Sequence, residues 1–260
     1  MVIFKDFISY QDTIPEILQE SGLAEKIKKQ NQILIKPNLT INIPPPATTP
    51  IELAQEVVKF CQKNSQARII IAEGSGGCDT NRAFEELGYF ELGKKYNIEI
   101  LDLNRTPRIK KENQKAMALK KVFLPKIAFE SFIINLPVLK VHLEAKMTSA
   151  MKNIFGFYLN KGYLSKVGEF LVARIFRENW WNKSELHFLG ISRVIIDLNS
   201  YIKFDFNLVD ASIGQVGSET HGAPCDPPIG KIIAGSDAKE VDRACAPLLG
   251  LKAEEIKYLN

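Results

Sequence analysis

The sequence has few cysteines, and their positions exclude several classes of metal site. The four cysteines lie far apart and form no Cys-x-x-Cys pair: Cys61, Cys78, Cys225 and Cys245. This spacing excludes a zinc ribbon, and we expect no intrinsic iron-sulfur cluster. A chain of 260 residues with 45% hydrophobic residues can bury a sizeable core without disulfides. The cysteine usage therefore predicts a reducing, cytoplasmic location.

Long hydrophobic runs are also missing from the sequence. No uninterrupted apolar run approaches the roughly 18 residues that a membrane span needs. The first residues, MVIFKDFISYQDT, contain too short an apolar run for a signal peptide. We therefore expect a chain without a transmembrane segment or a secretory leader.

Positive charge is concentrated in one segment, although the net charge is only +4. Residues 105–126 contain eight lysines or arginines and a single acidic residue, Glu112. Such a run can neutralise nucleic-acid phosphates, but it lacks the interleaved aromatic side chains of single-strand binding platforms. We predict an antiparallel ribbon or a solvated surface excursion here, and we do not expect nucleic-acid binding.

Hydrophobic residues occur in short runs that alternate with amphipathic helical segments. The runs typical of buried strands are residues 32–36, 68–72, 98–103, 131–136, 206–209 and 231–234. One intervening helix is predicted to begin at Thr49-Pro50-Ile51-Glu52, where Thr49 and Glu52 would form a capping box. This alternation predicts an α/β fold with a mostly parallel, doubly wound sheet flanked by helices, in a single domain over residues 1–260.

One segment is too apolar to be an ordinary surface helix. Residues 163–181 place Leu164, Val167 and Leu171 on a helical pattern with interspersed basic residues, and Trp180 and Trp181 end the segment. We predict a helical insertion or lid over residues 158–186. It would pack against the domain, a second copy in a homodimer or a partner protein, and membrane-surface binding is a weaker alternative.

Polar residues follow the predicted strands closely. In open α/β sheets, ligands bind beyond the carboxyl ends of the strands. The residues at these ends are Lys36, Asn38, Glu73, Ser75, Asp102, Asn104, Lys140, His142 and Asp210. The ordinary polarity of loops explains any one of them, but several polar ends together predict a single cleft.

Residues 135–157, NLPVLKVHLEAKMTSAMKNIFGF, are the densest polar cluster. They are expected to form a loop and a helix start that bring together Lys140, Lys146, Lys152, Thr148, Ser149 and Asn153. Ammonium groups that converge with hydroxyls and helix-start amides would bind a carboxylate or phosphate. The alternative is a solvated basic loop, but the apolar residues among them are expected to anchor the helix in the core.

A glycine-rich turn follows the second predicted strand. The turn is GSGG at residues 74–77, and it matches neither G-x-G-x-x-G nor a Walker loop, so it implies no nucleotide. The backbone at Gly74 and Ser75 could approach an anion near the start of the next helix. A tight turn without a ligand is the alternative interpretation.

Histidine is scarce, and the three histidines lie in different loops or helix starts. His142, His187 and His221 could share a metal ion with carboxylates, although their spacing does not require it. His142 is the strongest candidate because it follows a strand end. Together with Glu73 or Asp210, it could move protons or hold a metal.

Several motifs in this sequence resemble one known family. They are Lys36-Pro37-Asn38-Leu39, Glu73-Gly74, Leu87-Gly88-Tyr89, Ile134-Asn135-Leu136-Pro137 with Lys140 and His142, MTSAMKNIFG at residues 147–156, Asp197, Val209-Asp210, and Ala234-Gly235-Ser236-Asp237 with Val241-Asp242. In this order they resemble the uncharacterised family named domain of unknown function 362, over nearly the whole chain.

The resemblance implies a fold and a ligand site more than a reaction. Many members of that family carry an added ferredoxin-like module with clustered cysteines, and this chain lacks those cysteines. The family is distantly similar to the amino-terminal domain of nickel-pincer lactate racemases, which hold a nucleotide-derived cofactor through Lys and His. Residues 163–181 look like extra length relative to the family.

Two functions remain open from the sequence. The first is an enzyme-like protein that binds a small anion, or an organic or metal cofactor of unknown identity, in the cleft. Lys36, Lys140, Lys146 and Lys152 would hold the anion, and Asn38 and Asn153 would orient it. The second is a redox or maturation accessory that docks a partner, including an iron-sulfur protein, and has no catalysis of its own.

Overall fold

The structure is a computed structural model that describes residues 1–159, 183 and 185–260. Its centre is a mixed sheet of ten strands with the order β1-β12-β10-β7-β2-β3-β4, in which β8 and β11 also pair with β10, and β9 pairs with β8. The strands are β1 (Val2–Asp6), β2 (Gln32–Pro37), β3 (Arg68–Glu73), β4 (Glu99–Asp102), β7 (Phe132–Leu136), β8 (Val138–His142), β9 (Lys146–Thr148), β10 (Phe206–Val216), β11 (Ala223–Pro224) and β12 (Lys231–Gly235). A separate ribbon pairs β5 (Arg108–Glu112) with β6 (Lys121–Pro125).

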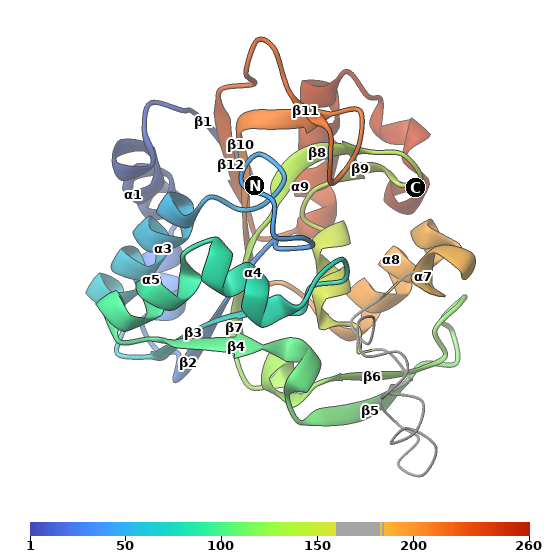
Figure 1. The fold of residues 1–260 in the computed structure, drawn as a ribbon, viewed down its shortest axis with the longest axis horizontal. Helices are drawn as coiled ribbons and strands as arrows, with labels where there is room; N and C mark the ends of the chain where they lie inside the picture. The colour runs from blue at the N-terminus through green and yellow to red at the C-terminus, as the bar shows by residue number, and fades with distance from the viewer. Residues whose placement is uncertain (160–182, 184) are drawn as a thin grey trace.

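Helices flank this sheet (Figure 1). The α-helices of the described residues are α1 (Tyr10–Glu20), α2 (Leu23–Ile27), α3 (Ile51–Asn64), α4 (Thr80–Glu86), α5 (Tyr89–Tyr96), α7 (Glu185–Phe188), α8 (Ile191–Tyr201) and α9 (Ala238–Cys245). Short 3-10 helices are η1 (Leu103–Arg105), η2 (Lys126–Phe129), η3 (Lys152–Phe157), η5 (Ala246–Leu249), η6 (Ala253–Glu255) and η7 (Lys257–Leu259). The predicted α/β class with a mostly parallel sheet is confirmed.

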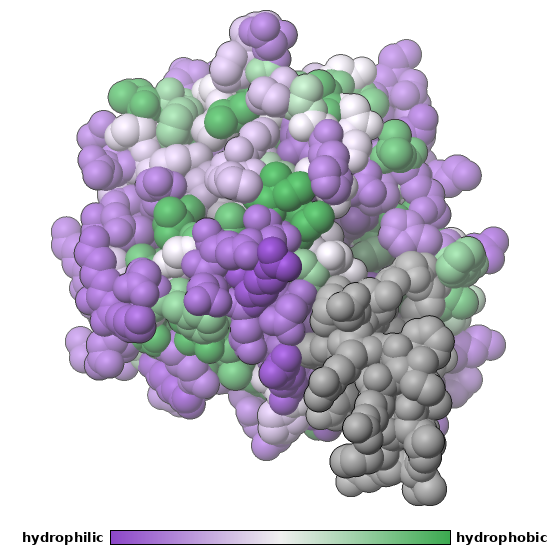
Figure 2. All heavy atoms as spheres, viewed as in Figure 1, coloured by the Kyte–Doolittle hydropathy of each residue, from purple (hydrophilic) through white to green (hydrophobic). Residues whose placement is uncertain are grey.

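The central strands are buried on both faces, as the continuous apolar runs predict. In β2, Ile33 and Ile35 pack into a core with α1, α3 and α5, whereas Leu34 packs into a second core with α8 on the other face. Successive side chains of a strand point to opposite faces, so three consecutive apolar residues serve two cores. Hydrophilic residues predominate over the outward side of α3 and α5 (Figure 2).

The order of the strands creates a switch point between β2 and β7. From β2 the chain moves outward through β3 and β4, and it then returns to add β7 and β10 on the other side of β2. These five strands are parallel, and β12 is antiparallel to β10. Ligand crevices of open α/β sheets form at such a point, beyond the carboxyl ends of the strands.

The predicted capping box at the start of α3 is wrong. Helix α3 begins at Ile51 without a side-chain cap. The Thr49 hydroxyl instead accepts a hydrogen bond from the Asn38 amide at 2.7 Å and donates to the Leu136 carbonyl at 2.6 Å. Thr49 therefore ties β2 to β7, because its hydroxyl finds long-range partners that the local sequence does not reveal.

The expected loop and helix start in residues 135–157 is also corrected. The chain forms a hairpin of β8 and β9 and then the 3-10 helix η3. Neither Thr148 nor Ser149 caps this helix. The Asp242 carboxylate of α9 accepts hydrogen bonds from the amides of Ala150 at 2.6 Å and Met151 at 3.1 Å. A distant carboxylate thus replaces the local cap and occupies the amides that were expected to face an anion.

The basic segment forms the antiparallel ribbon that the sequence allowed, with Arg108 opposite Pro125 and Glu112 opposite Lys121. The apolar segment at residues 163–181, and with it most of the predicted insertion and partner surface over 158–186, lies outside the described residues. Within the described residues, no helix is long and apolar enough to cross a membrane.

The tip of the β5–β6 ribbon is held by one buried carboxylate. Asp197 of α8 accepts hydrogen bonds from the amides of Met117, Ala118 and Leu119 at 2.9, 2.7 and 2.8 Å. We expect Asp197→Ala to lower the free energy of unfolding by on the order of 3 kcal/mol, because three amides lose a charged acceptor. Urea unfolding measures the loss, and hydrogen exchange should rise at residues 113–120.

Glu130→Ala is the control for this substitution. It removes an exposed ion pair with Lys126 near the same ribbon, and we expect a loss below about 1 kcal/mol. Equal losses in the two variants would contradict the anchoring role of Asp197.

Candidate functional site

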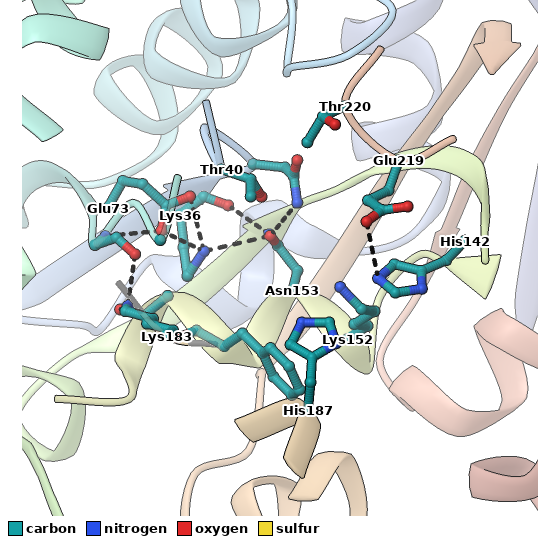
Figure 3. Close-up of a pocket in the computed structure, with 15 residues that line it drawn as sticks. Lys36, Thr40, Glu73, His142, Lys152, Asn153, Lys183, His187, Glu219 and Thr220 are labelled. Carbon is teal, nitrogen blue, oxygen red and sulfur yellow. Dashed lines mark hydrogen bonds and ion pairs between the residues drawn. The ribbon is translucent and has the colours of Figure 1, made fainter. Parts of the chain in front are cut away.

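A pocket opens at the switch point between β2 and β7. We name it the switch-point pocket, and its volume is about 200 Å³. It is lined by Lys36, Asn38, Thr40, Glu73, Gly74, Gly76, His142, Lys152, Asn153, Phe155, Gly156, Lys183, His187, Glu219 and Thr220. Figure 3 shows Lys36, Glu73 and Lys183 on one side of Asn153, and His142, Lys152 and Glu219 on the other.

A buried ion pair forms the floor of this pocket. The Lys36 ammonium lies 2.9 Å from Glu73 Oε1, and both side chains are almost fully buried. Glu73 also accepts hydrogen bonds from the amides of Leu39 at 2.9 Å and Gly74 at 2.7 Å. Burial lowers the pKa of Lys36, while the charge of Glu73 opposes that shift. Both carboxylate oxygens of Glu73 therefore already have partners within the protein, which argues against its predicted proton-transfer role.

Asn153 is the centre of the hydrogen-bond network. Its Oδ1 accepts from Lys36 Nζ at 3.3 Å and from Asn38 Nδ2 at 2.8 Å. Its Nδ2 donates to Asn135 Oδ1 at 2.7 Å and to the Pro37 carbonyl at 3.2 Å. These bonds join η3 to the ends of β2 and β7, so Asn153 positions the pocket wall.

The predicted lysines take different positions. Lys140 is buried, does not line the pocket, and donates to the Ala47 carbonyl at 2.6 Å and Asn38 Oδ1 at 3.2 Å. Burial, reinforced by the charge of Lys152, lowers the Lys140 pKa to about 7. Lys146 is exposed on β9 and does not line the pocket. Only Lys36 and Lys152 of the four predicted lysines reach it.

Lys152 is the lysine that faces the pocket without a partner of opposite charge in contact. Its ammonium lies 5.0 Å from the centre of the Phe155 ring and makes no hydrogen bond or ion pair with the described residues. Burial lowers its pKa to about 8, against the opposing attraction of Glu219 and Glu144. An anion placed here would gain a charge interaction that the described residues leave unused.

Lys183 is the third lysine of the pocket, and its ammonium donates to three carbonyl oxygens. It donates to the carbonyls of Gly74 at 2.6 Å, Phe155 at 3.0 Å and Gly156 at 3.2 Å. Burial lowers its pKa to about 7. Lys183 therefore joins the glycine-rich turn to η3 across the pocket.

His142 is held in one tautomer by the backbone of its own hairpin. Its Nδ1 accepts hydrogen bonds from the amides of Glu144 at 3.1 Å and Ala145 at 3.0 Å, so the neutral ring carries its proton on Nε2. Burial, helped by the charge of Lys152, lowers the His142 pKa to about 2. The ring presents an N–H donor, and Glu219 Oε1 lies 3.8 Å from Nε2.

This tautomer does not suit the predicted metal role of His142. A metal ion binds the lone pair of an imidazole nitrogen, and Nε2 carries a hydrogen here while Nδ1 is used by two amides. His221 is exposed on the loop before β11 and does not line the pocket. Within residues 1–159, 183 and 185–260, no three His, Cys, Asp or Glu residues cluster as metal ligands.

The glycine-rich turn is tied to protein atoms rather than open to an anion. The amide of Gly74 donates to Glu73, that of Ser75 donates to the Thr80 hydroxyl at 3.1 Å, and that of Gly77 donates to the Thr40 carbonyl at 2.9 Å. The Ser75 hydroxyl donates to the Leu39 carbonyl at 2.5 Å. Gly74 lines the pocket, but the amides of Gly74, Ser75 and Gly77 already bond to protein atoms and do not point to a ligand.

Asp210 lies apart from the switch-point pocket. Its carboxylate accepts hydrogen bonds from the Tyr10 hydroxyl at 3.0 Å and the Ser212 amide at 2.8 Å, and burial raises its pKa. It borders a separate cavity of about 10 Å³ next to Pro45 and Pro46. Asp210 joins α1 to β10, and its distance from the pocket argues against its predicted partnership with His142.

Four polar residues of the pocket escaped the sequence reasoning: Lys183, Glu219, Thr40 and Thr220. Glu219 and Thr220 lie in the glycine-containing loop after β10, where only His221 was considered. Lys183 carries no motif, since its role depends on carbonyls from two distant segments. Gly156, the last residue of the motif MTSAMKNIFG, also lines the pocket, and a Cβ at this position would lie 2.1 Å from Glu73 Oε1 and 2.4 Å from Lys36 Cε.

The comparison with family models decides where the chain belongs. The model described as "Domain of unknown function (DUF362)" matches residues 33–247. The chain belongs to the DUF362 family. This confirms the resemblance that the sequence motifs indicated. No curated protein matches the chain.

Two solved structures are similar to this DUF362 chain. One is a Thermotoga maritima protein solved by a structural genomics consortium, with 14% identity and a TM-score of 0.49, over 96% of this chain and 61% of that one. The other is the lactate racemase apoprotein from Thermoanaerobacterium thermosaccharolyticum, with 17% identity and a TM-score of 0.49, over 98% of this chain and 57% of that one. The DUF362 chain thus spans less than two thirds of either structure.

The lowered pKa of the buried Lys140 predicts how the free energy of unfolding depends on pH. The Lys140 pKa is about 7 in the folded chain and 10.5 for an ordinary lysine. Between these values the unfolded chain binds more protons, so the free energy of unfolding should rise with pH, by up to about 1.4 kcal/mol per unit. Urea unfolding between about pH 7 and about pH 10 measures this slope.

Lys140→Gln should flatten the slope by a similar amount, because the titrating group is removed from the fold. The same substitution at the exposed Lys120 is the control. An unchanged slope in Lys140→Gln would contradict the shifted pKa of Lys140.

Proposed function

We propose that this DUF362 chain binds a small anionic molecule, with a carboxylate or phosphate group, in the switch-point pocket. The observation that carries the proposal is the Lys152 ammonium, which makes no hydrogen bond or ion pair with the described residues, although Glu219 and Glu144 attract its charge from a distance. Lys36 is matched by Glu73, and Lys183 by three carbonyl oxygens. The only contact of the Lys152 ammonium among the described residues is the Phe155 ring, so a direct contact with a negative charge is still available to it.

His142 supports the same proposal by offering a second donor. Its Nε2–H lies in the same part of the pocket as Lys152 (Figure 3). The carboxylate of Glu219 is 3.8 Å away, which is too far for a hydrogen bond. An anion between Lys152 and His142 would therefore give the imidazole a stronger acceptor than the structure supplies.

The remaining polar residues position these two donors. Asn153 holds η3 against β2, and the Lys36–Glu73 pair fixes the floor beneath it. The pocket of about 200 Å³ is smaller than the roughly 300 to 1,000 Å³ typical of drug-sized ligands, which favours a molecule of a few carbon atoms. Anion binding, rather than metal binding, is the activity that this set of donors supports best.

Substitution of Lys152 tests the proposal. We expect Lys152→Gln to weaken the binding of phosphate or oxalate, measured by isothermal titration calorimetry, by about 10- to 100-fold, because a charged hydrogen bond is lost. Thermal stability should change little, since Lys152 bonds to no described residue. Lys146→Gln is the matched control, because it removes an exposed lysine of the preceding strand β9, outside the pocket.

Unaltered affinity in Lys152→Gln, or an equal loss of affinity in Lys146→Gln, would contradict the proposal. Unfolding of Lys152→Gln would show instead that this lysine is structural.

The affinity should also depend on pH. The pKa of Lys152 is about 8 in the free protein, so the ammonium loses its proton above that value. A bound anion favours the charged form, and binding above about pH 8 must therefore be accompanied by proton uptake. Calorimetry in two buffers of different ionisation enthalpy should detect this uptake and a falling affinity. Constant affinity up to about pH 10 would contradict a role for Lys152.

A further inference from the structure

A histidine and a carboxylate form a hydrogen-bonded pair at the pocket. His187, in α7, lies with Nδ1 at 2.5 Å from Oε2 of Glu144, which belongs to the turn between β8 and β9. A carboxylate can only accept, so Nδ1 of His187 carries the hydrogen. The neutral ring then has its lone pair on Nε2. This arrangement orients a histidine for accepting a proton.

His142 and His187 are thus prepared for opposite tasks. Their rings are nearly parallel, with centroids 6.0 Å apart and an interplanar angle of 18°, and both line the switch-point pocket. His142 presents Nε2–H because two backbone amides occupy its Nδ1. His187 presents a bare Nε2 because Glu144 accepts from its Nδ1. A donor and a base therefore lie side by side, next to the Lys152 ammonium (Figure 3).

Three side chains that could act as nucleophiles are unsuited to covalent chemistry here: Cys78, Ser75 and Lys183. Cys78 is buried, its pKa is raised to about 11 mainly by burial, and it does not line the pocket. The Ser75 hydroxyl donates its hydrogen bond to the Leu39 carbonyl. Lys183 is surrounded by carbonyl oxygens. The paired His142 and His187 rings supply the groups that proton transfer needs.

We propose that the switch-point pocket catalyses reversible proton transfer at the carbon beside the carbonyl of a small 2-oxo acid, with His187 as the base. This inference rests on the anion-binding function proposed above. The substrate carboxylate would lie on Lys152, and its carbonyl oxygen would accept the His142 hydrogen bond. A neutral N–H donor suits an oxygen that is uncharged at first and becomes negative in the transition state.

The step balances without an oxidant or a reductant. The C–H bond at the carbon next to the carbonyl breaks, and its proton moves to Nε2 of His187. The electron pair of that bond forms a C=C bond, and the carbonyl π electrons move onto oxygen to give an enolate at the His142 donor. The imidazolium of His187 is stabilised by Glu144, and it returns the proton, or a solvent-derived one, to the carbon.

Exchange of substrate hydrogen with deuterated solvent tests the inference directly. Pyruvate, 2-oxobutyrate and hydroxypyruvate are incubated with the full chain in D₂O near neutral pH, and loss of the C3 proton signal is followed by NMR. We expect the protein to accelerate exchange of at least one of these acids. His187→Asn should reduce the rate by about 10² to 10⁴, the usual contribution of a general base.

Two variants of Glu144 distinguish a role in orienting the base His187 from a purely structural role. Glu144→Gln should lower the maximal exchange rate more than it changes the substrate concentration at half-maximal rate, and Glu144→Asp should restore part of the rate, because it returns a carboxylate. His221→Asn is the matched control, since it removes an exposed histidine outside the pocket. Exchange that persists at the full rate in His187→Asn would overturn the assignment of the base.

Oxalate distinguishes failure of this inference from failure of the anion site. Oxalate resembles the planar enolate of pyruvate, so we expect it to bind at least about 10²-fold more tightly than acetate, as transition-state analogues do. Oxalate binding that depends on Lys152, with no exchange of any of the three acids, would overturn proton transfer and leave the anion site standing. Absence of both phosphate and oxalate binding would overturn both proposals.

Discussion

The buried ion pair between Lys36 and Glu73 is the constraint around which the site is built. Removing two charges from water costs several kcal/mol for each ion, and only close partners offset this cost. The amides of Leu39 and Gly74 complete the shell of the carboxylate. Gly156 allows this close approach, because a Cβ there would lie 2.1 Å from Glu73 Oε1 and 2.4 Å from Lys36 Cε, and the pair would have to shift. The pair therefore brings η3 into contact with the ends of β2 and β3.

That contact determines which charges are available for a ligand. Once Lys36 is neutralised and Lys183 is enclosed by carbonyls, Lys152 at the start of η3 is the ammonium left to meet an anion among the described lining residues. The two histidines are differentiated in the same way. Backbone amides make His142 a donor, and a carboxylate makes His187 an acceptor. Identical side chains acquire different chemistry from their hydrogen-bond partners.

Local patterns predicted the sheet better than they predicted the helix starts. The runs at residues 32–36 and 68–72 are strands because a continuous apolar segment suits a position between two cores. Thr49 had the right sequence for a cap but bonds to Asn38 and Leu136 instead. The hairpin after β7 was missed because its polar residues resemble a loop, and its stabilising partner Asp242 lies far along the chain.

The sequence by itself determined the α/β class, the family and the strand ends at which the pocket lies. It also identified Lys152 and Asn153 as residues of that pocket. Only the tertiary structure decided that Glu73 and Lys140 serve as internal partners, that Asp210 lies elsewhere, and that Lys183 and Glu219 belong to the site. The physical reason is that an ionisable side chain can contact a ligand only when its charged atoms are not already hydrogen-bonded or ion-paired within the protein. The residues that form those bonds lie in distant segments of the sequence.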